Sequence, residues 1–464
     1  MAEPKRCART RAALWIALGV AAVWSGPASA QTLSEALSYA YNNNPQLLAQ
    51  RAALRATDEQ VPQALSNWRP TVNFTGQAGY ERGAISQSGR PSAFSNFVER
   101  SLDLRITQPI YRGGRTEAQT RQAINQVQAA RAQTLATETT VFQAVCQAFL
   151  DVVRDQTLVE VNRSNEAVLK KQLDATRDRF KVGEVTRTDV AQAESSYSQA
   201  QATRITSEGQ LEVSRAAYTR AVGHPPGRLV MPKERPALPA SRDEALSLAA
   251  NNNYNVIAGT FTELAAKDNV ELVRGQLLPQ VNIIGDLSRS YSPSITLNTA
   301  REDTASVVAQ VTVPLYEGGA IYSQTRAAQQ AVGARRSQVD DARRQAVQQA
   351  SQAWDTLNSA RASIKSFSVA VRAAQIALAG TQQEALVGSR TVLDVLISEQ
   401  QLFTTQSQLV SADHDAAVAE FNVAAATGRL IAPQLHLPVQ LYDMEKHYKA
   451  VKDKLLGFKG GLSE

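Results

Sequence analysis

The chain has 464 residues, with 49 Lys and Arg against 43 Asp and Glu, which gives a net charge of +6. Residues 1–30, which we expect to be cleaved, contain four basic residues and one acidic residue, so the remainder carries only +3. A charge this close to zero does not favour nucleic acid as a partner. Of the two cysteines, only Cys146 lies outside the cleaved segment, so we expect no internal disulfide.

Residues 1–30 have the pattern of a secretory signal peptide. Four basic residues precede an apolar run from Ala12 to Trp24, and small residues lead up to Ala30. This run is too short to span a bilayer, so we expect export and cleavage rather than a membrane helix. No cysteine follows the predicted cleavage site, which argues against a lipid anchor there. The rest of the chain contains no apolar run of about 18 residues, so it is either soluble outside the cytoplasm or enters a membrane as strands.

The sequence repeats itself. PIYRGGRTEAQTRQA at 109–123 matches PLYEGGAIYSQTRAA at 314–328, and VGEVTRTDV at 182–190 matches VGSRTVLDV at 387–395, both 205 positions later. SEALSYAYNNNPQ at 34–46 matches DEALSLAANNNYN at 243–255, but 209 positions later. The shift in offset places a longer loop between residues 74 and 109. These matches predict a tandem duplication, with repeat 1 at 31–240, repeat 2 at 241–432 and a C-terminal tail at 433–464.

Each repeat contains one segment of alternating apolar and polar residues, which predicts β-hairpins at about 70–110 and 279–315. Tilted strands of about ten residues match the apolar band of an outer-membrane barrel, about 25 Å tall. The linking segments 83–99 and 289–303 are rich in Gly, Ser, Asn and charge, as external loops are. Two hairpins on a soluble β-domain are the alternative. No other segment looks like a sheet on which they could pack.

The remaining segments predict long helices. No proline occurs between residues 110 and 224 or between 315 and 432, where helix-forming residues dominate. We expect helical hairpins at about 114–222 and 319–427 that turn near Gly183 and Gly388, with a coiled-coil seam of apolar residues at Phe142, Val145, Phe149, Val152 and Val159. Half-length helices at 33–66 and 241–277 complete each repeat, and the proline-rich segment 223–240 links the two repeats.

Four strands are too few to close a barrel, and an open sheet edge in lipid is very costly. We therefore expect subunits to share one barrel, so that each chain contributes a segment of a tube. The strand-to-helix junctions have a common motif, made of Pro109, Tyr111, Gly113 and Gly114 in repeat 1 and of Pro314, Tyr316, Gly318 and Gly319 in repeat 2. A phosphate-binding loop is the alternative for Arg-Gly-Gly-Arg. It is disfavoured because no Lys-Ser/Thr pair follows.

The duplication, these junctions and the VG-x₅-DV segments resemble the TolC-like outer-membrane channels of efflux pumps and type I secretion systems. The resemblance implies a mostly α, mixed fold in which a homotrimer forms a 12-stranded barrel continued by a helical tunnel across the periplasm. It also implies an equatorial band built from 223–240 and 433–464, contact with outer-membrane lipid, and no cofactor. The implied partners are a periplasmic adaptor (membrane fusion protein) and an inner-membrane pump or ABC exporter. The cargo stays open between drug, polysaccharide and protein.

The turns between the long helices are the candidate gate. Gly183 and Gly388 fit the left-handed position that ends a helix, while Thr186 with Asp189, and Thr391 with Asp394, read as capping boxes that open the return helices. Capping alone can explain both aspartates. The resemblance adds a gate in which Arg390 ties the inner hairpin to a neighbour, Asp189 is an acid it can pair with, and Asp394 forms a ring around a threefold axis.

Two positions depart from the family pattern, because Ala385 replaces an expected gate tyrosine and Ile397 replaces a second ring acid.

Nothing in the sequence favours catalysis. The four histidines, His224, His414, His436 and His447, lack the spacing of metal ligands, and Asp413-His414-Asp415 reads as a solvated helix turn. The lysine-rich tail, with Lys446, Lys449, Lys452, Lys454 and Lys459, reads as a solvated or disordered end. A periplasmic coiled-coil adaptor or scaffold without a pore is the second hypothesis. The alternating strands favour the channel, because an adaptor has no use for lipid-facing apolar residues.

Overall fold

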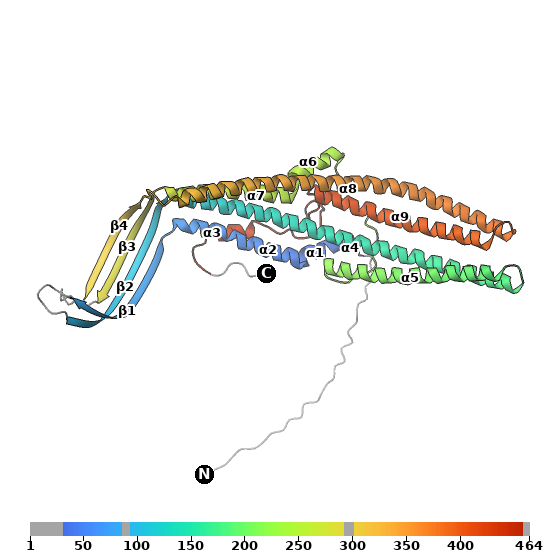
Figure 1. The fold of residues 1–464 in the computed structure, drawn as a ribbon, viewed down its shortest axis with the longest axis horizontal. Coiled ribbons are helices and arrows are strands. Elements are labelled where there is room, and N and C mark those ends of the chain that lie inside the picture. Colours follow the sequence, from blue (N-terminus) through green and yellow to red (C-terminus); the bar gives the residue numbers. More distant parts are fainter. Residues whose placement is uncertain (1–30, 86–92, 292–300, 458–464) are drawn as a thin grey trace, which may run out of the picture.

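The computed structural model describes residues 31–85, 93–291 and 301–457. The predicted signal peptide, the central parts of both predicted external loops and the final residues, with Lys459, lie outside these ranges. The molecule is elongated, with a sheet at one end and a long bundle of mostly helical segments that occupies the rest (Figure 1).

The sheet has four antiparallel strands in the order β1-β2-β3-β4. They are β1 (Thr71–Ile85), β2 (Ala93–Arg112), β3 (Gln280–Tyr291) and β4 (Glu302–Thr312). The prediction that all of 83–99 is loop is wrong, because β1 and β2 continue pairing through Gly83 and Ser95 to the end of β1. In the added part of β2, residues 93–99 (AFSNFVE), apolar residues fall at both odd and even positions, so the alternation that revealed the rest of the strands gave no signal there.

The strand registers bring the alternating apolar residues onto one face. Phe74 pairs with Leu104, Leu104 with Leu287, and Leu287 with Ala305. Side chains on this face are open to the surroundings, with Val72 62% and Phe74 70% exposed. A broad exposed apolar face of this kind is rare on a soluble monomer, so the sheet is built to meet lipid or protein.

Two helices of 67 residues each, α4 (Arg115–Lys181) and α8 (Ala320–Leu386), run the length of the helical region, about 100 Å at 1.5 Å per residue. Each turns back at the end far from the sheet, into α5 (Arg187–Val222) and α9 (Val392–Ala426) respectively (Figure 1). The five predicted seam residues of α4 are all buried. Among the described residues, no helix has both the length and the apolarity needed to cross a membrane.

The two half-length segments are each broken into shorter helices. The first comprises α1 (Leu33–Asn43), α2 (Pro45–Asp58), α3 (Gln60–Leu65) and the 3₁₀ turn η1 (Ser66–Trp68). The second comprises α6 (Arg242–Asn252), α7 (Tyr254–Arg274) and η2 (Gly275–Leu277). The breaks occur at Asn44 and Asn253, whose side chains accept hydrogen bonds from the backbone of Gln46 and Asn255. Each asparagine thus starts a new helix, and the repeated Asn-Asn-Asn motif was the signal for it.

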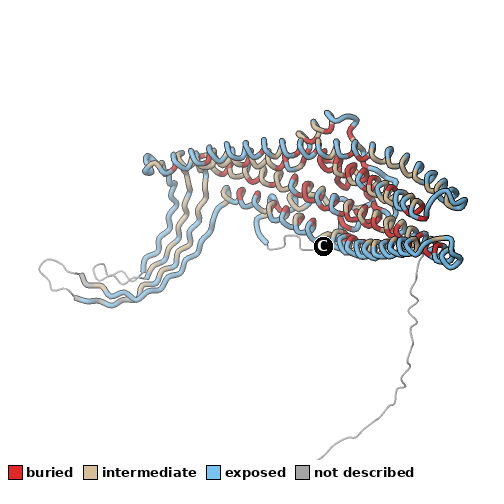
Figure 2. Tube along the Cα trace, turned by 45° about the vertical axis from the view of Figure 1, so that its right-hand side comes forward, coloured by how far each residue is buried: buried red, intermediate tan, exposed pale blue. Residues whose placement is uncertain are grey.

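The largest core lies halfway along the helices, where burial is concentrated in Figure 2. It joins α1, α4, α5 and α9 with the chain after α9, through Tyr41, Phe142, Phe149, Tyr218 and Leu430. The linker 223–240 is fixed to this region by Arg235, which donates to the buried Glu420 at 2.6 Å, while Arg361 donates to the other oxygen of Glu420 at 2.9 Å.

The described part of the tail is docked rather than solvated. After α9 the chain passes along the core, and the short helix α10 (Lys446–Val451) packs on α2. His447 Nδ1 lies 3.1 Å from Oδ2 of the fully buried Asp58, and Val451 is only 3% exposed. The expectation of a solvated end is therefore wrong at His447 and Val451, which make these contacts, while Lys446, Lys449 and Lys452 are exposed as expected.

Candidate functional site: the helical tips and the strand junctions

Both helical tips turn through a left-handed glycine. Gly183 has a φ of +80° and Gly388 a φ of +82°, values that a residue with a side chain rarely adopts. The amide of Gly388 donates to the carbonyl of Ala385, and that of Ser389 donates to Glu384 at 3.0 Å. The equivalent pair of bonds closes the first tip. This Schellman arrangement satisfies the last carbonyls of α4 and α8 and reverses the chain within a few residues.

Both capping boxes predicted from the sequence are present. Asp189 accepts from the Thr186 amide at 2.8 Å and Thr186 Oγ1 accepts from the Asp189 amide, while Thr391 and Asp394 repeat the arrangement at 2.9 and 3.2 Å. Hydrogen bonds from the threonine backbone and hydroxyl lower the pKa of both aspartates below the usual range. Both acids therefore stay charged at neutral pH.

Each tip contains its own ion pair. Arg390 Nε lies 2.9 Å from Glu384 Oε2 in the second tip, which raises the pKa of the arginine, and Arg179 Nε lies 3.1 Å from Glu184 Oε2 in the first. Within the described chain Arg390 and Asp189 are not bonded to each other. The predicted gate residues thus all lie at the tips, where Arg390 and Asp189 each have a partner within their own tip.

Apolar side chains surround these polar groups without covering them. Val182 is 72% exposed, Leu386 79% and Val387 81%, next to the two tip glycines. Ile397, at the position where a second ring acid was expected, is also exposed. The tips therefore present a mixed apolar and charged surface.

The two strand-to-helix junctions have the same motif but different surroundings. Gly113 is tightly packed, because a Cβ there would lie 2.3 Å from the carbonyl oxygen of Gly275. Gly318 has no atom within 4 Å of the corresponding position. The neighbouring Leu315 and Tyr316 are 93% and 83% exposed, whereas Tyr111 of the first junction is 43% exposed. Only the first junction is covered by its own chain.

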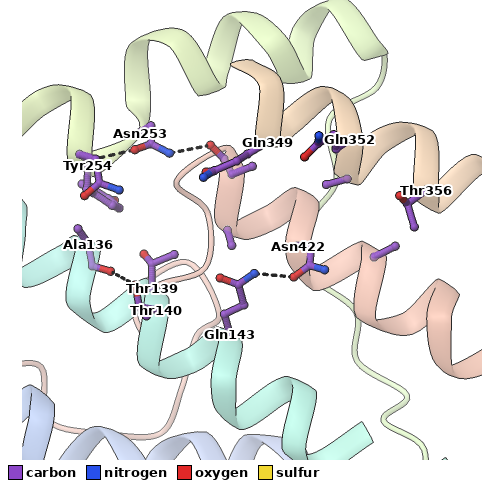
Figure 3. A pocket seen from close by; sticks show the side chains of 15 residues that line it. Ala136, Thr139, Thr140, Gln143, Asn253, Tyr254, Gln349, Gln352, Thr356 and Asn422 are labelled. Carbon is purple, nitrogen blue, oxygen red and sulfur yellow. Dashed lines mark hydrogen bonds between the residues drawn. The ribbon is translucent and has the colours of Figure 1, made fainter. Parts of the chain in front are cut away.

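A polar cavity of about 450 Å³ lies where α9 ends and α7 begins, beside α4 and α8 (Figure 3). Gln143 donates to Asn422 at 2.7 Å across it, and Asn253 donates to the carbonyl of Ala426 at its edge. None of its lining residues carries a charge. The cavity therefore offers hydrogen bonds but no acid, base or carboxylate ligand. Among the described residues, no group of three His, Cys, Asp or Glu side chains is arranged to hold a metal.

The prediction that Asp413-His414-Asp415 is solvated is wrong at its centre. His414 is 4% exposed, and its Nε2 lies 2.8 Å from Asp151 Oδ1 on α4. Its Nδ1 lies 3.0 Å from Asp415 Oδ1. Burial works against protonation, but the two carboxylates outweigh it and raise the pKa of His414. The polar neighbours in sequence concealed that His414 falls on the face of α9 that packs against α4.

Comparison with known proteins identifies the family of this chain. The model of the family described as outer membrane efflux protein matches residues 36–224 and 245–429. The outer membrane efflux protein BepC of Brucella suis is 35% identical over 433 residues, which cover 93% of each chain. The outer membrane protein TolC of Vibrio cholerae is 28% identical and covers 88% of this chain and 92% of its own.

Solved structures share the fold. The CmeC outer membrane channel of Campylobacter jejuni superposes with a TM-score of 0.77 at 15% identity, covering 91% of this chain and 89% of its own. The outer membrane protein VceC of Vibrio cholerae gives a TM-score of 0.75 at 19% identity, covering 85% and 96%. The resemblance inferred from the sequence is confirmed. The chain belongs to the outer membrane efflux protein family, and it acts in the outer membrane, with its helices in the periplasm, as an exit duct for efflux or secretion.

Proposed function

We propose that three copies of this chain form one continuous duct, with a 12-stranded β-barrel in the outer membrane and a tunnel of coiled-coil helices in the periplasm. Transport through it is passive, without a catalytic step. The observation that carries the proposal is the sheet with two free edges. Within the described residues, β1 and β4 each pair with a single strand, and one face of the sheet is apolar and exposed. Lipid does not tolerate unpaired strand edges, so further copies must supply the missing partners.

The internal repeat supplies a template for the contact between copies. Strand β4 corresponds to β2 and β1 corresponds to β3, so the β2–β3 register can be transferred to β4 and the neighbour's β1. In the chain itself Leu104 pairs with Leu287. The position 205 residues after Leu104 is Ala309, and the position 209 residues before Leu287 is Ala78. The transferred register therefore pairs Ala309 with the neighbour's Ala78. This register keeps the apolar faces of both strands on the same side, as closure of a lipid-facing barrel requires.

A contact between helices can be transferred to neighbouring copies in the same way. Arg121 on α4 lies 3.1 Å from Asp268 on α7. The equivalent positions are Arg326 on α8 and Glu59 at the end of α2, so the charges are kept although the acid is different. Arg326 is exposed and makes no ion pair with another described residue. A neighbouring copy that contributes Glu59 would complete the pair and cover Leu315, Tyr316 and Gly318.

One sequence difference would make the contact between copies differ from the one within the chain. The position equivalent to Gly275 is Ser66, so the covered Gly318 junction must be slightly wider than the Gly113 junction.

We place the gate at the helical tips. The 31–240 and 241–432 repeats would alternate around the tunnel, with 223–240 and the tail from 433 as a band halfway down. Arg390 and Asp189 from neighbouring copies, together with a ring of three Asp394, would hold the periplasmic end closed until partners engage the tips. The partners fitting this role are a periplasmic adaptor and an inner-membrane pump or ABC exporter. Opening then requires the α8–α9 hairpin to separate from the α4–α5 hairpin.

A pair of cysteines tests the arrangement. In protein carrying Ala78→Cys and Ala309→Cys, oxidation in the outer membrane should link copies into a ladder that ends at three chains. Matched controls are the single variants and the pair Ala78→Cys with Ala305→Cys, which is displaced by four residues along β4. A chain that remains monomeric with every pair contradicts the shared barrel. Equal linking by both pairs contradicts the register.

A further inference from the structure

Besides Glu420, which is paired with two arginines, helix α9 bears two buried titratable side chains that the proposed gate does not use, Glu399 and His414. Glu399 lies about 16 Å from Gly388 along the helix and His414 about 39 Å, at 1.5 Å per residue. Glu399 is 5% exposed and His414 4% exposed. His414 contacts Asp151 on α4, and Glu399 lies three residues after Leu396, which belongs to an apolar cluster with α4 and α5. The proposed opening would break these contacts between α9 and the α4–α5 hairpin.

Glu399 is buried without a cation. It lies one helical turn beyond Leu396, which packs with Leu169 and Leu173 of α4 and with Ala193 and Ala200 of α5. Its Oε2 has no hydrogen-bond partner. The side chain of Gln382 on α8 is the group that favours its charged form, and burial outweighs this and raises the pKa of Glu399.

In the first repeat, the acid at the equivalent position has a cationic partner. The positions equivalent to Glu399 and Gln382 are Glu194 and Arg177, and these form an ion pair at 3.4 Å on the surface. In the second repeat the arginine is replaced by a neutral glutamine while the acid is buried. An ionised carboxylate in such a place is strongly disfavoured, so the docked helix favours the protonated acid.

His414 is a base rather than an acid, but its contact with α4 is also strongest while it carries a proton. The groups facing it are Asp151 and Arg154 on α4 and Asp415 on α9 itself. Asp151 is also held by Gln147 and Arg154, and Arg154 reaches Asp155, which accepts from Ser214 on α5. A protonated His414 therefore joins α9 to a polar network that extends across α4 to α5. Loss of its proton removes the charge from the contact with Asp151.

We propose that Glu399 and His414 make closure of the duct proton-dependent, by docking α9 on the α4–α5 hairpin only while they carry protons. This inference rests on the proposed function, in which separation of these hairpins opens the duct. Closure is favoured in an acidic periplasm and relaxed as the periplasm becomes neutral or alkaline.

The direction follows from linkage. A group whose pKa is raised in the docked state binds its proton more tightly there, so its contribution is complete below its ordinary pKa and is lost as pH rises through the raised value. Both Glu399 and His414 have raised pKa values, so their effects add. The pKa of Asp151 is lowered, so its carboxylate loses its charge only in strong acid. Each proton changes the docking equilibrium by up to about tenfold per pH unit.

The test is the open fraction of the reconstituted wild-type trimer in planar bilayers, with the periplasmic side between pH 5 and pH 8. Hydrogen exchange of the α9 amides in the same trimer, corrected for intrinsic rates, measures docking independently. We expect both the open fraction and exchange to rise with pH. Glu399→Gln, which mimics the protonated acid, should keep the duct closed to higher pH. His414→Gln should be more open at pH 6 and should keep only the part of the pH dependence that Glu399 supplies.

Glu194→Gln is the matched control, because it alters the equivalent surface acid in the first repeat, and it should behave as wild type. The inference is overturned if wild-type channels form but neither readout changes with pH, or if Glu194→Gln shifts the profile as Glu399→Gln does. If a variant fails to assemble, the pH dependence of hydrogen exchange in the wild-type α9 still tests whether docking depends on protons. If no channels form from intact trimer, the proposed function fails first, and this inference fails with it.

Discussion

The tip glycines allow a sharp prediction about the turn that carries the candidate gate. At Gly388 the φ of +82° places the residue in the left-handed region, and a Cβ there would have no atom within 4 Å. Gly388→Ala therefore adds no clash. Its cost is the backbone strain of a left-handed L-residue, about 1–2 kcal/mol. Eight residues earlier, Gly380 lies in the regular helix α8, also with open space around it. Gly380→Ala should instead stabilise by about 0.5–1 kcal/mol.

Hydrogen exchange at the tip measures both changes. The amides of Gly388 and Ser389 are hydrogen-bonded to Ala385 and Glu384, so they exchange when the turn opens. Gly388→Ala should speed their exchange by about 5- to 30-fold, the factor that corresponds to 1–2 kcal/mol, whereas Gly380→Ala should slow exchange in the last turns of α8. Unchanged protection in Gly388→Ala, or equal effects of the two substitutions, would refute the left-handed turn as the source of tip stability.

Three further predictions concern the gate and the core. Arg390→Ala should raise the open fraction of single channels by up to about fivefold, since an exposed ion pair contributes at most about 1 kcal/mol; an unchanged open fraction removes Arg390 from the gate. Asp394→Ala should weaken cation selectivity and cost about 1 kcal/mol through the hydrogen bond lost from the capping box, while Asp394→Asn should lose only the selectivity; reversal potentials in a salt gradient should change alike in both variants, and only urea-induced unfolding should distinguish them. Phe149→Ala, in the fully buried core, should destabilise by about 3–5 kcal/mol in urea-induced unfolding, whereas an effect no larger than that of Val213→Ala, which is 61% exposed, would argue against that core.

Features set by local chemistry were predictable from the sequence. The helix ends at Gly183 and Gly388 depend on glycine alone. The capping boxes at Thr186 and Thr391 need only an acidic residue three positions later. The apolar seam of α4 follows from spacing, because the side chains that it buries recur with the period of the helix.

Features set by distant contacts were not predictable. His414 is flanked by two aspartates, and only its packing against α4 shows that it is buried. Likewise, the lysines of the tail suggested a solvated end, but His447 between them lies against the buried Asp58. The caps at Asn44 and Asn253 were within reach of sequence reasoning. The Asn-Asn-Asn motif was used as evidence of a repeat, and its meaning as a helix break was missed.

A single chain has too few strands to seal a barrel, so we expect it to open a path only as part of an assembly. Single-channel recording from the purified mature protein, with the copy number of the same sample measured by mass, tests this most directly. We expect trimers that insert into bilayers and give a discrete, stable conductance. Monomers that never insert, or trimers that insert without conducting, would contradict it.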